Sequence, residues 1–383
     1  MKPPPCPMTF FRHLLLTFTL AFTSSMSAAS QLIFIGTYTP KDGASRGIYA
    51  VRLDTLTGEL SKPVLAAESA SPTFLALHPD GRVLYALSEA DAIAGRPGGG
   101  ATAFQIDAAA GRLTVLNQQS TGGIGCAHIG IDPAGRTLVL ASYGGRQVTS
   151  FPVEADGRIG PRVSVQMLTG PLGPNQSRQD QPHPHSVTFS PDSRFAYVCD
   201  LGLDKIFRYR IDAAALIPAG AFPSAPGAGP RHSKFSADGK FFYVIDELDG
   251  TIATYACDPA TGALTPKQVV PTLPAGFSGG NTCAEIRLHP NGRFVYGSNR
   301  GHDSLAVFAR NGTDGTLTPV EIVPCGGKHP RNFALSPDGQ WLVCANRDSN
   351  NLVVFKVDSA TGRLTATGHT ASVPLAVCVL FCP

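Results

Sequence analysis

Apolar and polar residues alternate in six similar stretches of the chain, each with two strand-like runs joined by a tight turn. The runs follow the two-residue period of a β-strand, and the turns carry Pro, Asp, Asn, Ser or Gly, which are typical turn residues. One stretch reads HSKFSADGKFFYVIDE, and the six begin at Phe74, His128, His185, His232, Glu285 and Asn332. Successive turns are roughly 45 to 60 residues apart, a spacing typical of a β-propeller with one blade per repeat.

Each hairpin is followed by a third strand-like run, and turns such as DPATGALT lead from it into a fourth. Strand-like residues also open and close the chain, in LIFIGTYTP from Leu32 and PLAVCVLFCP from Pro374. Together these features predict an all-β, seven-bladed β-propeller with four-stranded antiparallel blades, in which N- and C-terminal strands share a blade. Because the repeat covers nearly all of the chain, we expect one domain over residues 30–383. Six or eight blades are alternative counts.

The first 29 residues differ from the repeats. Lys2 and Arg12 precede the apolar run LLLTFTLAF, and small residues ending in SAA follow it. Since this run is too short to span a bilayer, we expect residues 1–29 to be a cleaved secretory signal peptide. The mature protein would then be periplasmic or secreted, with no membrane association. The formal net charge of +3, without a run of Lys or Arg, gives no basis for a nucleic-acid partner.

The hairpin spacing indicates which residues meet at the end of each blade remote from its turn. In an antiparallel hairpin, paired residues have a constant sum of residue numbers. Counting outward from the turns pairs His185 with Asp200, Arg231 with Asp246 or Glu247, Arg331 with Asn346, and Arg300 with Cys283. Because every blade presents this end to the same face of the central channel, we expect the residues to converge there.

The converging side chains suit acid–base and oxyanion chemistry. They are His183, His185, Arg231, Glu247, Arg300, Arg331 and Arg347, and His128 falls at a matching position. Histidine can act as a general base near neutral pH, and arginine binds a carboxylate, a phosphate or a developing oxyanion. A single strand-end His or Arg is more often structural, but several at matched positions favour a site. The sequence has no CxxC pair and no carboxylate cluster for a metal site, and no GxSxG nucleophile elbow between a strand and a helix. We expect no cofactor and no metal.

Several phrases resemble the seven-bladed lactonases typified by the propeller 6-phosphogluconolactonase and the carboxymuconate lactonizing enzyme. They include IGTYT from Ile35, SRQDQPHPHSV from Ser177 and GPRHSKFSADGKFFYVIDEL from Gly229. The resemblance implies four catalytic residues, His185, Arg231, Glu247 and Arg300. His185 would activate water, the two arginines would hold the substrate and stabilise an oxyanion, and Glu247 would orient an arginine or assist proton return. We expect His183, Arg331, Asn346 and His128 to bind substrate.

The resemblance also implies a small-molecule lactone substrate. We expect hydrolysis of an aldono-1,5-lactone, either glucono-1,5-lactone or 6-phosphogluconolactone, and an exported enzyme would more readily meet the unphosphorylated compound. One alternative is a cycloisomerase that closes a carboxymuconate into a lactone with similar residues. The other is a non-catalytic propeller that binds a ligand or a protein, since fold alone does not fix function. The protein would be a monomer or a dimer.

Overall fold

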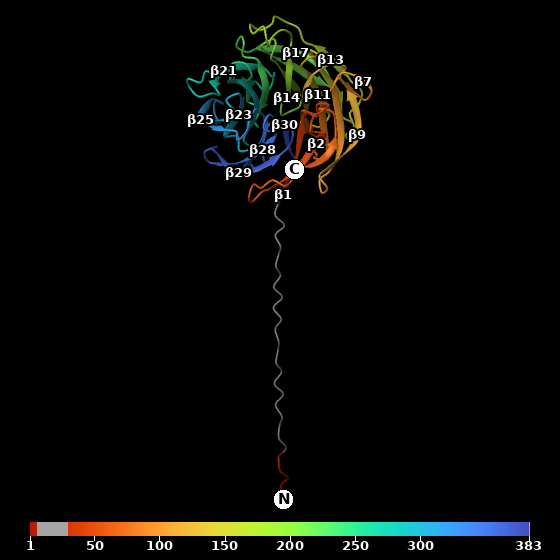
Figure 1. The fold of residues 1–383 in the computed structure, drawn as a ribbon, viewed down its shortest axis with the longest axis vertical. Coiled ribbons are helices and arrows are strands. Elements are labelled where there is room, and N and C mark those ends of the chain that lie inside the picture. The colour runs from red at the N-terminus through yellow and green to blue at the C-terminus, as the bar shows by residue number, and fades with distance from the viewer. Residues whose placement is uncertain (6–29, 383) are drawn as a thin grey trace.

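The described residues, 1–5 and 30–382 of a computed structural model, form seven four-stranded antiparallel sheets and a small two-stranded one. The large sheets follow one another around a central axis as the blades of a propeller (Figure 1). This confirms the predicted all-β fold and its seven blades. In the described part of the chain, no helix is long and apolar enough to cross a bilayer. The predicted signal peptide, residues 1–29, lies outside the described residues from position 6 onward.

Blade 1 is built from both ends of the chain. Its strands, in sheet order, are β3 (Val64–Glu68), β2 (Gly47–Asp54), β1 (Ser30–Thr37) and β30 (Ala376–Phe381). The first and last strands therefore lie side by side, with Ile33 paired to Phe381 and Ile35 to Val379 (Figure 1). This pairing closes the ring and covers strand edges that would otherwise be open to other chains.

The other blades each use four strands that follow one another in the chain. Blade 2 contains β4 (Leu75–Leu77), β5 (Val83–Ser88), β8 (Gly100–Asp107) and β9 (Arg112–Ser120), and the hairpin β6 (Ala92–Ile93) and β7 (Arg96–Pro97) is inserted in it. Blade 3 contains β10 (Cys126–Ile131), β11 (Thr137–Ser142), β12 (Gln147–Pro152) and β13 (Ser164–Met167). Blade 4 contains β14 (Pro184–Phe189), β15 (Phe195–Asp200), β16 (Lys205–Asp212) and β17 (Ala215–Pro223).

Blades 5 to 7 repeat the same order. Blade 5 contains β18 (Pro230–Phe235), β19 (Phe241–Asp246), β20 (Thr251–Cys257) and β21 (Leu264–Pro271). Blade 6 contains β22 (Thr282–Leu288), β23 (Phe294–Arg300), β24 (Ser304–Arg310) and β25 (Leu317–Pro324). Blade 7 contains β26 (Pro330–Leu335), β27 (Trp341–Asn346), β28 (Asn351–Val357) and β29 (Leu364–Ser372). The first strand of blades 2 to 7, and β30 of blade 1, contact one another around the axis.

The core lies between neighbouring blades. The second strands β5, β11, β19 and β27 are buried along their whole length, because both faces of a blade pack against other blades. Outer strands such as β17 are mostly exposed or partly buried. In the described residues the eight cysteines are all buried and none forms a disulfide, so they pack as small apolar side chains.

Buried tyrosines fasten each of four blades to the next one. Tyr85 donates a hydrogen bond from its hydroxyl to the carbonyl of Gly157 at 3.0 Å. Three further pairs repeat the arrangement: Tyr197 with Gly262 at 2.7 Å, Tyr243 with Gly315 at 2.9 Å, and Tyr296 with Gly362 at 3.0 Å. At the closing joint Trp341 of blade 7 donates from Nε1 to the carbonyl of Thr55 in blade 1 at 3.1 Å. These bonds hold the blades, and with them the channel, at fixed positions.

Candidate active site

A β-bulge interrupts the innermost strand of several blades at the end remote from the turn, and in three of these blades the unpaired residue is charged or titratable. In blade 4, Pro184 pairs with Asp200 and Ser186 with Cys199, so His185 between them has no partner on β15. The same shift leaves out Arg231 in blade 5 and Arg331 in blade 7. A bulge bends its strand locally and re-aims the extra side chain. Three of the charged or titratable residues singled out from the sequence therefore occupy one recurrent backbone irregularity.

The bulges correct the pairing predicted from residue spacing. Counting outward from the turn paired His185 with Asp200, Arg231 with Asp246 or Glu247, and Arg331 with Asn346, but these partners belong to Pro184, Pro230 and Pro330. Arg300 pairs with Thr282 rather than with Cys283. The count assumes an unbroken ladder, and an unpaired residue on one strand shifts every later pair by one. The prediction that these residues lie at the end of the hairpin remote from the turn was nevertheless right.

A pocket of about 290 Å³ lies where these ends meet. We call it the channel pocket; it is lined by Glu89, Gly125, Ala127, Tyr143, Gly144, Arg178, His185, Glu247, Arg300 and Arg331. Because residues from blades 2 to 7 contribute, the pocket lies on the propeller axis. Two recurrent positions supply most of the side chains. One is the bulge, and the other is the end of the second strand, where Glu89, Tyr143 and Glu247 follow β5, β11 and β19 directly.

Glu247 is the centre of the charged network. Its side chain is 3% exposed and one oxygen, Oε2, lies 2.8 Å from Arg231 Nε and 2.9 Å from Arg300 Nη2. The other oxygen accepts a hydrogen bond from Arg178 Nη2. Burial alone would raise the pKa of this carboxyl, but Arg300 and Arg231 bring the pKa well below its usual range. Glu247 is therefore ionised at neutral pH.

His185 lies beside this carboxylate without forming a hydrogen bond to it. The distance from His185 Nε2 to Glu247 Oε2 is 3.9 Å, and Nδ1 is buried without a partner among the described residues. The Tyr143 ring meets the imidazole edge-on at 5.5 Å between centroids. Burial and the nearby Arg231 lower the pKa of His185 well below 6.5. The imidazole is therefore neutral at pH 7 and free to accept a proton.

The two catalytic arginines inferred from the resemblance have different positions. Arg300 lines the pocket, and its Nη2 also donates to the carbonyl of Cys283 at 2.6 Å. Arg231 is 2% exposed and is not among the residues that line the channel pocket. Burial and Arg300 lower its pKa to about 9, which still leaves the guanidinium charged at neutral pH. Arg231 thus contacts Glu247 from within the protein.

Of the four residues expected to bind substrate, one lines the channel pocket and three do not. Arg331 lines the pocket, and its Nη2 donates to the Tyr38 hydroxyl at 2.9 Å. The structure places the other three outside the pocket lining. His183 stacks on Tyr143 with 3.9 Å between ring centroids, His128 packs against Phe74 at 4.1 Å, and Asn346 donates to the carbonyl of Cys325 at 3.2 Å.

Three lining residues with polar or charged side chains were missed in the sequence: Glu89, Tyr143 and Arg178. Glu89 and Tyr143 could have been found by aligning the hairpins, because they occupy the position that Glu247 occupies in blade 5. Arg178 belongs to the loop before blade 4 and lies in SRQDQPHPHSV, one of the phrases that carry the family resemblance, but it was not among the predicted site residues. Its neighbour Gln179 fixes the loop by donating to the carbonyl of Leu201 at 2.9 Å and to Asp204 at 2.7 Å.

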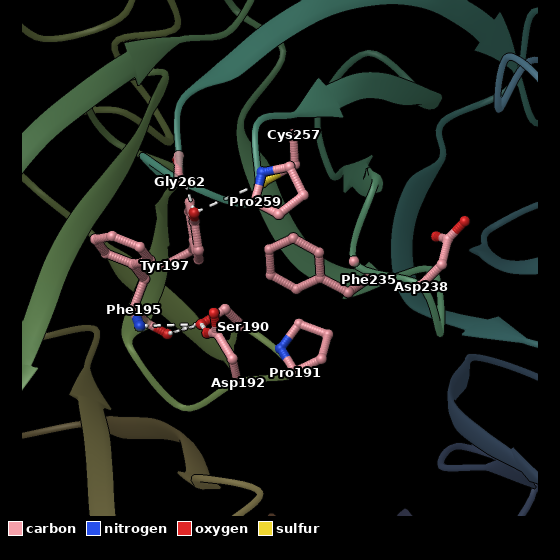
Figure 2. A pocket seen from close by; sticks show the side chains of 11 residues that line it. Ser190, Pro191, Asp192, Phe195, Tyr197, Phe235, Asp238, Cys257, Pro259 and Gly262 are labelled. Carbon is pink, nitrogen blue, oxygen red and sulfur yellow. Dashed lines mark hydrogen bonds between the residues drawn. The ribbon is translucent and has the colours of Figure 1, made fainter.

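A second cavity, of about 190 Å³, lies at the turn ends of blades 4 and 5 (Figure 2). Tyr197 and Gly262 are bonded there at 2.7 Å, and Ser190 donates to Asp192 at 2.7 Å (Figure 2). These hydrogen bonds involve residues of the turns. No histidine or arginine is among the described residues that line this second cavity. The channel pocket is therefore the better candidate for chemistry.

Comparisons with known proteins agree with the fold. A family model described as "Lactonase, 7-bladed beta-propeller" matches residues 32–381. The chain is 39% identical over 348 residues to the 6-phosphogluconolactonase of Bacillus subtilis strain 168, covering 91% of this chain and 97% of that protein. It is also similar to the solved structure of the periplasmic gluconolactonase of Pseudomonas aeruginosa. That match has 34% identity and a TM-score of 0.86, and it covers 93% of this chain and 99% of the other. This chain therefore belongs to the lactonase family of seven-bladed β-propellers.

Proposed function

We propose that this lactonase hydrolyses an aldono-1,5-lactone to the aldonic acid in the channel pocket. The observation that carries the proposal is the pairing of a neutral, buried His185 with the ionised Glu247 and its arginines in a single pocket. Ester hydrolysis needs a base for water and positive charge for the oxyanion, and this arrangement contains both. The family relationship supports the same reaction.

In this mechanism His185 takes a proton from a water molecule as the water oxygen adds to the lactone carbonyl. The carbonyl oxygen becomes an oxyanion, which Arg300 and Arg178 stabilise from the pocket wall. Glu247 orients both guanidiniums, and Arg231 holds Glu247 from beneath. Because the arginines are already fixed by this carboxylate, little reorganisation accompanies charge development.

We favour a substrate without a phosphate group. Glu247 pairs with both Arg178 and Arg300, which offsets part of the positive charge that a phosphate would need in the pocket. The Pseudomonas aeruginosa relative is named a periplasmic gluconolactonase, while the Bacillus subtilis relative is named a 6-phosphogluconolactonase. The leader-like first 29 residues favour a periplasmic or secreted enzyme, where sugar phosphates are scarce.

A titration assay tests this proposal. Acid release from glucono-1,5-lactone and from 6-phosphogluconolactone is followed in parallel at constant pH with the purified protein, and spontaneous hydrolysis is subtracted. We expect a larger kcat/KM for glucono-1,5-lactone. A larger value for the phosphorylated lactone would overturn the substrate preference, and no acceleration with either would overturn aldonolactone hydrolysis.

A further inference from the structure

Glu89 occupies in blade 2 the position that Glu247 occupies in blade 5. Each residue directly follows the second strand of its blade, Glu89 after β5 and Glu247 after β19, and both line the channel pocket. Blades 2 and 5 are three steps apart in a ring of seven, which is the largest separation that the ring allows. The two carboxyl groups therefore reach the pocket from opposite sides.

The surroundings of the two carboxyl groups differ. Glu247 is bound by three arginines, whereas Glu89 forms no ion pair within the described part of the chain. The Glu89 carboxyl is influenced by the charges of Arg331 and Arg231 and by hydrogen bonds from the hydroxyls of Thr73 and Tyr38. Arg331 instead donates to Tyr38 at 2.9 Å and its guanidinium lies 5.5 Å from the Tyr38 ring.

This environment shifts the pKa of Glu89 in the opposite direction from that of Glu247. Burial raises the pKa of its carboxyl, and Arg331 opposes that effect only in part. The same pocket thus holds one carboxylate that is ionised and one carboxyl group that retains its proton to higher pH. Two carboxyl groups in contrasting environments are a recurrent arrangement for separate acid and base roles.

We propose that Glu89 is a further catalytic residue of the channel pocket, the general acid that protonates the leaving ring oxygen of the lactone. This inference rests on the proposed lactone hydrolysis. His185 belongs to blade 4 and Glu89 follows the second strand of blade 2. His185 can therefore take a proton from water on one side of the pocket while Glu89 gives a proton to the leaving oxygen on another side.

The step balances without any further reactant. Water adds through its oxygen to the carbonyl carbon and gives a proton to His185. The tetrahedral intermediate then collapses, the bond from the carbonyl carbon to the ring oxygen breaks, and its electron pair stays on the ring oxygen. That oxygen takes the proton of Glu89. The imidazolium of His185 and the carboxylate of Glu89 return to their starting states by proton exchange through water, and the net change is one lactone and one water to one hydroxy acid.

The competing explanation is that Glu89 only positions Tyr38 and, through it, Arg331. The leaving group separates the two roles. An alkoxide is a poor leaving group and needs a proton, while a phenolate, with a conjugate-acid pKa of about 10, leaves without one. Loss of a general acid should therefore harm hydrolysis of an alkyl lactone much more than that of an aryl lactone. A positioning defect should harm both alike.

The test compares wild type, Glu89→Gln and Tyr38→Phe on glucono-1,5-lactone and on the aryl lactone dihydrocoumarin, with pH profiles for the first substrate. For Glu89→Gln we expect kcat on gluconolactone to fall by about 10²- to 10⁴-fold, the range of general acid catalysis. We expect a fall of less than about tenfold on dihydrocoumarin, and loss of the decline in activity that wild type shows as pH rises through the pKa of Glu89.

Three results would overturn the role of Glu89. They are an unchanged kcat on gluconolactone, equal losses on both lactones, or a Tyr38→Phe variant that reproduces the whole Glu89→Gln profile. If dihydrocoumarin is not a substrate, the pH profile decides alone, and a Glu89→Gln profile that keeps the alkaline decline refutes the proposal. A wild-type protein inactive on every lactone would refute the proposed function itself, which is a distinct outcome.

Discussion

Among single residues, Glu247 has the largest structural consequence in the site. It is the shared partner of Arg178, Arg231 and Arg300, and two of these guanidiniums are more than nine-tenths buried. Such a buried cluster is not a strong source of stability in itself, because desolvation offsets much of the Coulombic attraction. Removing the one anion, however, leaves buried cations without a counter-charge.

Replacing Glu247 with Gln should therefore destabilise the protein as well as lower its activity. We expect the free energy of unfolding to fall by about 3–5 kcal/mol, the cost of breaking a buried ion pair from one side. Urea denaturation of Glu247→Gln and of the exposed control Glu59→Gln measures the difference. If the two variants unfold at the same urea concentration, the buried network has no such role.

The pH dependence of activity follows from His185. A general base must be neutral, and burial together with Arg231 holds the pKa of His185 well below 6.5. As pH falls, kcat/KM should stay constant through 6.5 and decline only at lower pH. A profile of kcat/KM against pH on glucono-1,5-lactone shows the position of this decline. A decline centred at or above about 6.5, the ordinary histidine value, would contradict the burial argument.

Residue types and motifs pointed to several residues that line the channel pocket. His185, Glu247, Arg300 and Arg331 were all singled out in the sequence, and the structure places all four in the channel pocket. Glu89 and Tyr143 were missed because no motif surrounds them, and their only signal is a position directly after the second strand of a blade, like that of Glu247. That His128, His183 and Asn346 lie outside the pocket lining could not be read from spacing, because spacing does not give side-chain direction.

At the level of elements, the sequence predicted the hairpins but not the β-bulges that interrupt them. Alternation of apolar residues and turn chemistry were enough to find the first two strands of blades 2 to 7. The bulges at His185, Arg231 and Arg331 leave no signature in a two-residue period, because one unpaired residue at a strand end does not disturb the buried part of the strand. Yet these bulges, rather than regular pairing, set where the three side chains lie.

The bonds between blades give a prediction at this level. Tyr296 is buried and its hydroxyl donates to the carbonyl of Gly362 in the next blade at 3.0 Å. Tyr296→Phe should lower the free energy of unfolding by about 1 kcal/mol, the net value of one such hydrogen bond. Thermal or urea unfolding of Tyr296→Phe beside Tyr49→Phe, whose ring is only partly buried, checks this. Equal stability of the two variants would show that the bond does not fasten the blades.

On the scale of the whole molecule, closure of the ring brings the residues of the channel pocket together. Residues from β5 to β26 come together because β1 and β30 join the two ends of the chain in one blade. The sequence predicted this closure, since strand-like residues were visible at each end of the chain. Packing between blades sets the width of the channel and determines which side chains lie at its opening. This packing cannot be read from the sequence of a single repeat.

The measurement that tests the central claim most directly is the rate of glucono-1,5-lactone hydrolysis by His185→Ala, beside wild type and the control His369→Ala on the outer strand β29. We predict that His185→Ala loses at least about 10²-fold in kcat/KM, as expected for loss of a general base, while His369→Ala keeps the wild-type value. Full activity of a folded His185→Ala enzyme would contradict the assignment of the chemistry to this pocket.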